Sequence, residues 1–363
     1  MLSSVMTTVL AAAGSAGGAG EDMTIHAWEW IVLAVIIVGL IAFDIVGHVR
    51  TPHEPTLKES AWWSLGYVAI ALVFGVYVWW VHGPTYGGEY YAGWITEKAL
   101  SVDNLFVFVI IIAAFKVPRK FQQKALLYGI VIALIMRLVF ILIGAAIIER
   151  FVGVFFLFGA FLIWTAVQQA RQGVEDPNEQ EEYDENGFVT WVRKRFPVTE
   201  GFVADKLIHR HGGKTYMTPM FLVILALGSA DLMFALDSIP AVYGLTSQPY
   251  LVFACNAFSL LGLRQLYFLI DGLLDRLIYL HYGLAAILGF IGVKLVIHAI
   301  NGTILDDAPV AEQIYEPTSA VSLSVIVGVL VVTVLASLLS PRGKEAARVA
   351  KEKAAQKAVE ADD

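Results

Sequence analysis

The chain is poor in charged residues and has one cysteine in 363 residues. Charged residues make up 16% and hydrophobic residues 58%, whereas a soluble domain has roughly 25% charged and 45–50% apolar residues. So little polar surface cannot cover the chain in water, and the chain must face lipid. The single Cys255 excludes an internal disulfide, a CxxC redox pair and a zinc site built from several thiolates.

Three functional classes lack support in the sequence. The motifs G-x-x-x-x-G-K-[ST] and G-x-G-x-x-G are missing, so nucleotide hydrolysis and dinucleotide chemistry are not indicated. The formal net charge of −7 disfavours a nucleic-acid partner, which normally requires a clustered basic face. No nucleophile and base stand at a plausible spacing, so we expect no enzymatic activity and no cofactor.

Long apolar runs are what the sequence has instead. A helix that crosses a bilayer needs about 20 predominantly apolar residues. We therefore predict an all-α, polytopic membrane protein, since a barrel would show short alternating segments. The nine predicted spans are 25–45, 61–81, 93–115, 125–148, 151–170, 218–243, 250–270, 279–300 and 319–339.

Lysine and arginine are distributed very unequally among the predicted loops. Twenty of them fall on one side of the nine spans and only Arg150 falls on the other. Because cytoplasmic loops are rich in these residues, we predict an external N-terminus and a cytoplasmic C-terminus in the cell membrane. The odd number of spans follows from the same alternation.

The segments outside the predicted membrane domain, residues 25–340, differ in composition. Residues 1–24 are rich in Ala, Gly and Ser and are predicted to form an external disordered tail. Residues 171–217 are predicted to be a solvated cytoplasmic loop, and residues 341–363 a charged cytoplasmic tail close to lipid headgroups. Tryptophans near the span ends are interpreted as interfacial anchors, namely Trp28, Trp30, Trp62, Trp63, Trp79, Trp80 and Trp94.

Ionisable residues inside the spans form a repeated pattern. Glu97 and Asp103-Asn104 are matched by Asp231 and Asp237-Ser238 at a constant offset of 134 residues. The third and sixth spans would cross in opposite directions, so we predict an inverted-topology repeat of spans three to five and six to eight. Transporters with such repeats bind substrate near the middle of the membrane. A second register, at offset 128, aligns Ser101 and Asp103 with Ser229 and Asp231 and matches fewer acids.

Helix periodicity places the matched residues in two groups. At 100° per residue, Glu97, Ser101 and Asn104 share one face, whereas Asp103 lies about 100° away from Asn104. The same relation holds for Asp231 and Ser238 against Asp237. Pro240 removes an amide donor, so we expect a broken helix that offers a free carbonyl beside Asp237.

Carboxylate, amide, hydroxyl and carbonyl oxygens are hard ligands that suit Mg²⁺, Ca²⁺ or Mn²⁺. The predicted ligands for a divalent cation are Asp103, Asp237, Asp231, Glu97, Asn104, Ser238 and Asp44. Alternatively, Asp103 and Asp237 form buried ion pairs with Arg137 and Arg264. We expect Lys294 to extend its ammonium toward the membrane surface.

Two long motifs are similar to those of a known family. Residues 97–108 (EKALSVDNLFVF), followed by Val117-Pro118 and residues 123–129 (QKALLYG), resemble the first signature of the TerC integral membrane family. Residues 234–242 (FALDSIPAV) with Thr246 resemble the second signature. The resemblance covers about residues 25–340.

The resemblance implies a multi-pass protein that is linked by name to tellurium resistance and, through better-supported members, to manganese export. It also implies that transport depends on the acids Glu97, Asp103, Asp231 and Asp237, together with Asp44 of the first span. No residues suited to tellurite reduction are present in this chain.

Two hypotheses follow. The first is a secondary transporter that exports divalent cations, with Mn²⁺ as the leading candidate. The second is a membrane scaffold that supplies metal to other membrane or secreted proteins, or docks them, through the 171–217 loop, with a tellurium-resistance role as one form of it. Lipid and a divalent metal ion are the expected partners in either case, and the sequence gives no oligomeric state.

Overall fold

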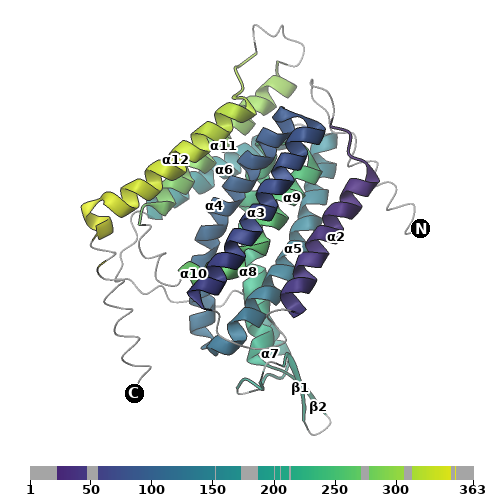
Figure 1. Cartoon of the computed structure of the whole chain (residues 1–363), viewed down its shortest axis with the longest axis vertical. Coiled ribbons are helices and arrows are strands. Elements are labelled where there is room, and N and C mark those ends of the chain that lie inside the picture. The colour runs from purple at the N-terminus through teal and green to yellow at the C-terminus, as the bar shows by residue number, and fades with distance from the viewer. Residues whose placement is uncertain are drawn as a thin grey trace.

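A computed structural model shows that the protein is an all-helical polytopic membrane protein (Figure 1). The structure describes residues 23–46, 56–151, 153–172, 187–199, 201–204, 206–211, 214–270, 278–305, 313–344 and 348, without the side chains of Asp103, Phe106 and Phe188. Almost all of the predicted external tail and most of the charged C-terminal tail lie outside these residues.

The described chain contains helices at every predicted span. They are α2 (Ala27–Asp44), α3 (Leu57–His82), α4 (Pro84–Ala114), α5 (Arg119–Arg150), α6 (Val154–Gln172), α8 (Pro219–Tyr243), α9 (Pro249–Leu261), α10 (Leu263–Ile270), α11 (Leu280–Thr303) and α12 (Ser319–Leu339). Within the described residues, eight segments are long and apolar enough to cross a membrane, with α9 and α10 counted as one.

The predicted span 93–115 corresponds to α4, which differs from the prediction in two ways. It begins at Pro84 and is 31 residues long, so it starts well before residue 93. It is not among the eight apolar segments, because its apolar half also contains Glu97, Lys98 and Asp103. A tight turn joins it to α3: Gly83 has φ 96°, a conformation that glycine adopts without strain, and Pro84 starts the new helix.

The helices form a bundle in which α9 is the most enclosed element. Every residue of Pro249–Leu261 is buried, and α4, α5 and α8 pack around it. In Figure 1, α6, α11 and α12 lie on one flank of the bundle, and α2 lies on the opposite flank. The outer helices expose many large apolar side chains, such as Val35 and Val38 on α2 and Val332 and Leu335 on α12, as a lipid-facing surface requires.

Helices α6 and α11 approach each other unusually closely. A Cβ added at Gly159 would lie 2.9 Å from the carbonyl oxygen of Gly292, and a Cβ at Gly292 would lie 3.0 Å from that of Gly159. Only glycine allows the two backbones to come so near, which is the packing mode that small residues give to membrane helices.

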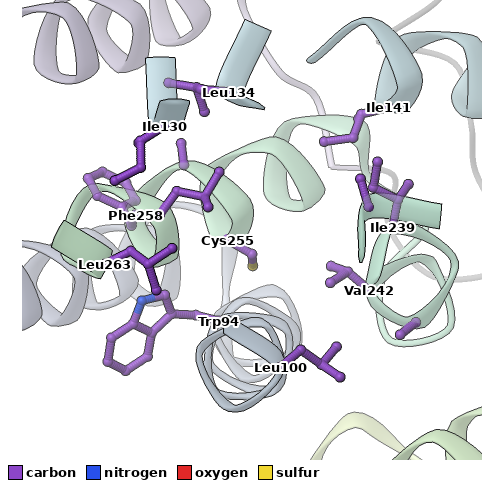
Figure 2. Close-up of a cluster of buried hydrophobic side chains, with 14 of the residues drawn as sticks. Trp94, Leu100, Ile130, Leu134, Ile141, Ile239, Val242, Cys255, Phe258 and Leu263 are labelled. Atoms are coloured by element: carbon purple, nitrogen blue, oxygen red, sulfur yellow. The ribbon is translucent and has the colours of Figure 1, made fainter. Parts of the chain in front are cut away.

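The interpretation of Trp94 as an interfacial anchor is wrong. Figure 2 shows it beside Leu263 in a cluster of buried apolar side chains that also contains Cys255 and Phe258. Because α4 begins at Pro84, position 94 lies three turns inside the helix and not at its end. Trp28, Trp62, Trp79 and Trp80 are exposed near helix ends, as predicted.

The predicted 171–217 loop is partly folded. It contains α7 (Gly187–Arg195) and an antiparallel hairpin of β1 (Ile208–His211) and β2 (Lys214–Met217), with Ile208 opposite Met217. In Figure 1 these elements project from the lower end of the bundle. Its acidic segment, residues 175–185, lies outside the described residues.

The predicted break at Pro240 is wrong. Helix α8 continues through Pro240 to Tyr243, so the proline stands inside the last turn. A proline three residues before the helix end removes the N–H that would bond to the Leu236 carbonyl without ending the helix. The helix ends are instead set by Gly244 here and by Gly262, which separates α9 from α10.

Candidate functional site: a buried arginine between two acids

Arg137 of α5 is fully buried and lies between carboxylates from two other helices. Its guanidinium forms an ion pair with Glu97 of α4. It also bonds both oxygens of Asp231 of α8, with Nε–Oδ2 at 2.8 Å and Nη2–Oδ1 at 3.2 Å. The same group donates to Ser238 Oγ at 3.1 Å and to Asn256 Oδ1 at 2.5 Å. Four helices therefore meet at one side chain.

Glu97 and Asp231 are the first acids of the two matched motifs, and the structure brings them to the same guanidinium. The predicted helix faces are confirmed: Glu97, Ser101 and Asn104 are all buried on α4, as are Asp231 and Ser238 on α8. The inverted repeat of the spans stays a prediction, although the convergence of the two acids is the arrangement it calls for.

The charges in this cluster do not cancel. Two carboxylates surround one guanidinium, so the fully ionised cluster has an excess of one negative charge. Among the described side chains, Glu97 Oε2 and Asn104 Nδ2 are buried without a hydrogen-bond partner. Buried charge is stable only when it is compensated, so the excess favours a bound cation or proton.

Arg264 of α10 has a different partner. Its Nη2 donates to Asp44 Oδ1 at 2.8 Å, and both side chains are almost fully buried. Asp44 is the last residue of α2, so this pair joins the start of α10 to the end of α2. The structure thus places the predicted ligand Asp44 in an ion pair that is separate from the Arg137 cluster.

The two second acids of the motifs are placed differently. Asp237 is half-buried on α8, and its carboxylate forms no hydrogen bond or ion pair with another described side chain. Its predicted pairing with an arginine is therefore wrong, because Arg137 contacts Asp231 and Arg264 contacts Asp44. The side chain of Asp103 is outside the description, so whether the two aspartates approach each other stays a prediction.

Several polar residues near the cluster were not singled out from the sequence. Asn256 lies in the apolar run LVFACNAFSLL of α9, and its amide was the only warning of its role. Ser259 of α9 accepts from Lys98 Nζ through its carbonyl at 3.1 Å, and its hydroxyl lies 3.2 Å from Ser101 Oγ. An amide or paired hydroxyls in a fully buried helix are the signal that would have revealed them.

A second missed group lies near the start of the described chain. Glu29 of α2 is buried and accepts from Tyr77 at 3.0 Å, and its Oε1 lies 2.9 Å from His82 Nε2. Both partners belong to α3, so Glu29 fastens α2 to α3. An acid in the first turn of a predicted span was visible in the sequence.

The described residues contain no group of three or more His, Cys, Asp or Glu side chains close enough to hold a metal ion together. In this conformation the guanidinium of Arg137 occupies the space between Glu97 and Asp231. A cation bound by these acids would need either the Asp103 carboxylate as a further ligand or a shift of Arg137.

Comparison with known proteins agrees with the motifs. Residues 82–345 match the family described as "Integral membrane protein TerC family". An uncharacterized membrane protein of Mycobacterium tuberculosis (strain ATCC 25618 / H37Rv) is 46% identical over 319 residues, which is 87% of this chain and 80% of that protein. The Escherichia coli (strain K12) protein provisionally named membrane-bound redox modulator Alx is 34% identical over 313 residues, 84% of this chain and 92% of the relative.

No solved structure matches the chain. The family match covers well over half of the sequence, including both acidic motifs and the helices from α4 to α12. The relatives are matched over most of their own length, so the likeness extends to the whole membrane domain. The chain belongs to the TerC family of integral membrane proteins.

Proposed function

We propose that the protein is a secondary transporter that exports divalent cations, with Mn²⁺ as the first candidate. The observation that carries the proposal is the cluster of Glu97, Asp231 and Arg137, in which buried negative charge exceeds buried positive charge. Ionisable groups inside a membrane protein are costly and mark ion pathways or proton relays. Oxygen ligands in this cluster suit a hard cation.

The carboxylates give a simple way to couple cation movement to protons. In one state they bind the cation, and in the other they bind protons, so a proton gradient can drive the exchange. Asp237 supports this role by its position, since it lies beside Ser238 and has no ion-pair partner among the described side chains. Proton coupling is proposed here from residue type alone.

We also propose that the N-terminus is external and the C-terminus cytoplasmic. The distribution of Lys and Arg among the loops supports this orientation. The described part of the basic 171–217 segment projects from one end of the bundle, and α12 begins toward the other end (Figure 1). The start of α12 would then face the outside of the cell.

A manganese accumulation assay tests the export function. Cells that lack the protein should hold more manganese than cells that express it, and Asp237→Asn expressed at the same level should behave as the empty vector does. Asparagine keeps the size of the side chain but removes the charge that offsets metal dehydration. Equal manganese in cells with and without the protein would sink the export function.

A docking role for the cytoplasmic segment is a second candidate, favoured by one observation. α7 and the hairpin are folded, and they expose Trp191, Phe196 and Ile208. The name of the E. coli relative refers to redox modulation. With Cys255 as the only thiol of this chain, such a role would act through metal supply to another protein and not through a thiol pair. The double change Phe196→Ser and Ile208→Ser should abolish the phenotype with intact metal flux if docking is the function.

A further inference from the structure

A second polar cavity lies away from the Arg137 cluster. It has a volume of about 280 Å³ and is enclosed by the start of α4, the end of α8, α11 and the start of α12. Its polar lining includes two carboxylates, an ammonium, an imidazole and several hydroxyl residues, among them Glu89, Glu316, Lys294, His298, Thr246 and Ser319. On the proposed orientation this cavity is at the external end of the bundle.

The carboxylates of the cavity are held by neutral or weakly basic partners. Glu316 Oε2 lies 3.1 Å from His298 Nδ1, and Ser319 Oγ donates to Glu89 Oε1 at 3.4 Å. The segment that carries Glu316 is fixed to α11, because the Asn301 side chain bonds both the N–H and the carbonyl of Ile314. The two acids are thus positioned by the fold while their charges stay uncompensated by a direct ion pair with lysine or arginine.

Lys294 supplies the observation that indicates what the cavity holds. Its side chain is 7% exposed and lines the cavity, yet within the described part of the chain its ammonium forms no hydrogen bond or ion pair. A buried ammonium without a direct partner is stable only in a field of negative charge. Glu89 and Glu316 line the same cavity and supply negative charge close to the ammonium. The cavity is therefore already built to hold a positive charge that touches neither acid.

We propose that this cavity is a second, low-affinity site for a hydrated divalent cation, and that Lys294 is the resident positive charge which weakens cation binding there. The inference rests on the proposed export function and adds its exit site. The dimensions fit, because six water molecules at about 30 Å³ each occupy roughly 180 Å³, less than the cavity offers. A hydrated ion needs no three-ligand cluster, and the described residues contain none.

The cavity and the central cluster both lie along α8. Asp231 and Ser238 contact Arg137, and Tyr243, the last residue of the same helix, lines the cavity. Lysine in this place keeps the external site weak, so that an exported cation leaves and external cations do not accumulate.

The test is Mn²⁺ binding by the full chain in nanodiscs of phosphatidylcholine, a zwitterionic lipid without net charge. Binding is measured as the loss of the EPR signal of free Mn²⁺. The wild-type protein should show a tight class and a weak class of sites. Lys294→Met should strengthen the weak class about tenfold, since it removes one unit charge close to a divalent cation in a medium of low dielectric. Lys294→Arg keeps the charge and should keep the weak affinity. The double change Glu89→Gln with Glu316→Gln should abolish the weak class.

A matched control separates the cavity from general charge effects. Lys98→Met also removes one buried ammonium, but Lys98 donates to the Ser259 carbonyl and does not line the cavity, so the weak class should not change. An unchanged weak class in Lys294→Met, or in the Glu89/Glu316 double variant, overturns the proposal. If Lys294→Met does not fold, the Glu89/Glu316 variant and Lys294→Arg decide it in the same assay.

The outcome for the cavity is distinguishable from the outcome for export. Asp103→Asn with Asp237→Asn should remove the tight class and leave the weak one. A protein with the weak class but no effect on cellular manganese would contradict export and leave the cation site standing. A protein that exports manganese but shows no weak class would contradict the external site alone.

Discussion

Two buried arginines in this protein have opposite charge balances. Among the described side chains, Arg264 at the start of α10 forms its ion pair with Asp44, whereas Arg137 in the middle of α5 is shared by Glu97 and Asp231. The first pair joins the ends of two helices and sets one acid against one arginine. The second cluster gathers four helices and retains an excess negative charge. The same residue types can therefore join two helices in one place and form a candidate cation site in another.

The number of acids around each buried arginine therefore distinguishes the two sites, whereas burial does not, since both arginines are buried. A buried ion pair contributes little net stability compared with apolar side chains, but breaking one is costly because it leaves a charge uncompensated. At Arg264, loss of the acid strands the arginine. At Arg137, loss of one acid still leaves the other. The two sites should thus respond differently to the same substitution.

The largest effect is expected from Arg137→Gln. It leaves Glu97 and Asp231 facing each other, so the folded state should lose about 3–5 kcal/mol, the usual cost of removing one member of a buried ion pair. The measurement is the melting temperature of the detergent-solubilised protein. Adding Glu97→Gln to Arg137→Gln should recover part of the loss, because only one acid then remains. A single variant that melts as the wild type does would contradict the charge balance described here.

Asp44→Asn should destabilise the folded state by a similar mechanism. The loss should be about 3 kcal/mol, since Arg264 loses its only direct acid partner in the described structure. Manganese flux per folded molecule should stay unchanged. The double variant Asp44→Asn with Arg264→Gln should melt at a higher temperature than the single variant. If the flux falls while the melting temperature stays unchanged, this prediction is wrong. Asp44 then takes part in transport, as the family resemblance implies.

Glu97→Gln should reverse that pattern. Arg137 keeps Asp231 as its partner, so the melting temperature should change much less than in Asp44→Asn. Manganese export should fall roughly tenfold or more, the size of effect that a loss of about 1.4 kcal/mol in cation binding produces. Asp231→Asn is the matched variant on the other helix. If both single variants melt at as low a temperature as Arg137→Gln does, the cluster has a structural role like that of the Arg264 pair.

The smallest effect is expected at the partly exposed pair of His298 and Glu316. Burial tends to raise the pKa of Glu316, but the hydrogen bond and charge of His298 prevail and lower its pKa below the ordinary value. A lowered pKa stabilises the folded state above the ordinary glutamate pKa, and this contribution disappears as the pH falls through the lowered pKa. Glu316→Gln should cost less than about 1 kcal/mol at pH 7, because exposed pairs contribute little.

The matching measurement is the melting temperature at pH 7 and at pH 3. The difference between wild type and Glu316→Gln should be present at pH 7 and shrink at pH 3, where the carboxylate of the wild type becomes protonated. A difference that grows on acidification would have the wrong sign.

The helices were predictable from the sequence because run length and composition suffice in a membrane. All nine predicted spans form helices, and α4 departs only because charged residues interrupt its apolar half. The motif faces on α4 and α8 were predictable too, since helical periodicity alone decides which residues share a side. Gly83-Pro84 indicates a tight turn, but the prediction started the span at residue 93. Trp94 was therefore placed at a helix end, although it lies inside α4.

The pairing of charges was not predictable, because it depends on how the helices rotate against one another. Periodicity says that Glu97 and Asp231 each face inward, but it does not say that Arg137 stands between them. The sequence predicted Asp103 and Asp237 as cation ligands, and only the alternative interpretation paired them with Arg137 and Arg264. The cavity that Lys294 lines was not predictable either, because Glu89 and Glu316 come from segments that are distant in the sequence.

The glycine contact between α6 and α11 limits which parts of the protein can move. At Gly159 and Gly292 the two backbones approach closely, and the side chains of Val296 and Ile163 pack against the opposite glycine. We therefore expect the two helices to move together in any rearrangement of the bundle. Since α11 also lines the second cavity, displacement of this helix pair against α4 and α8 would change the width of the cavity. Spin labels on α6 and α11 should then keep a fixed separation, whereas labels on α11 and α4 should report the displacement.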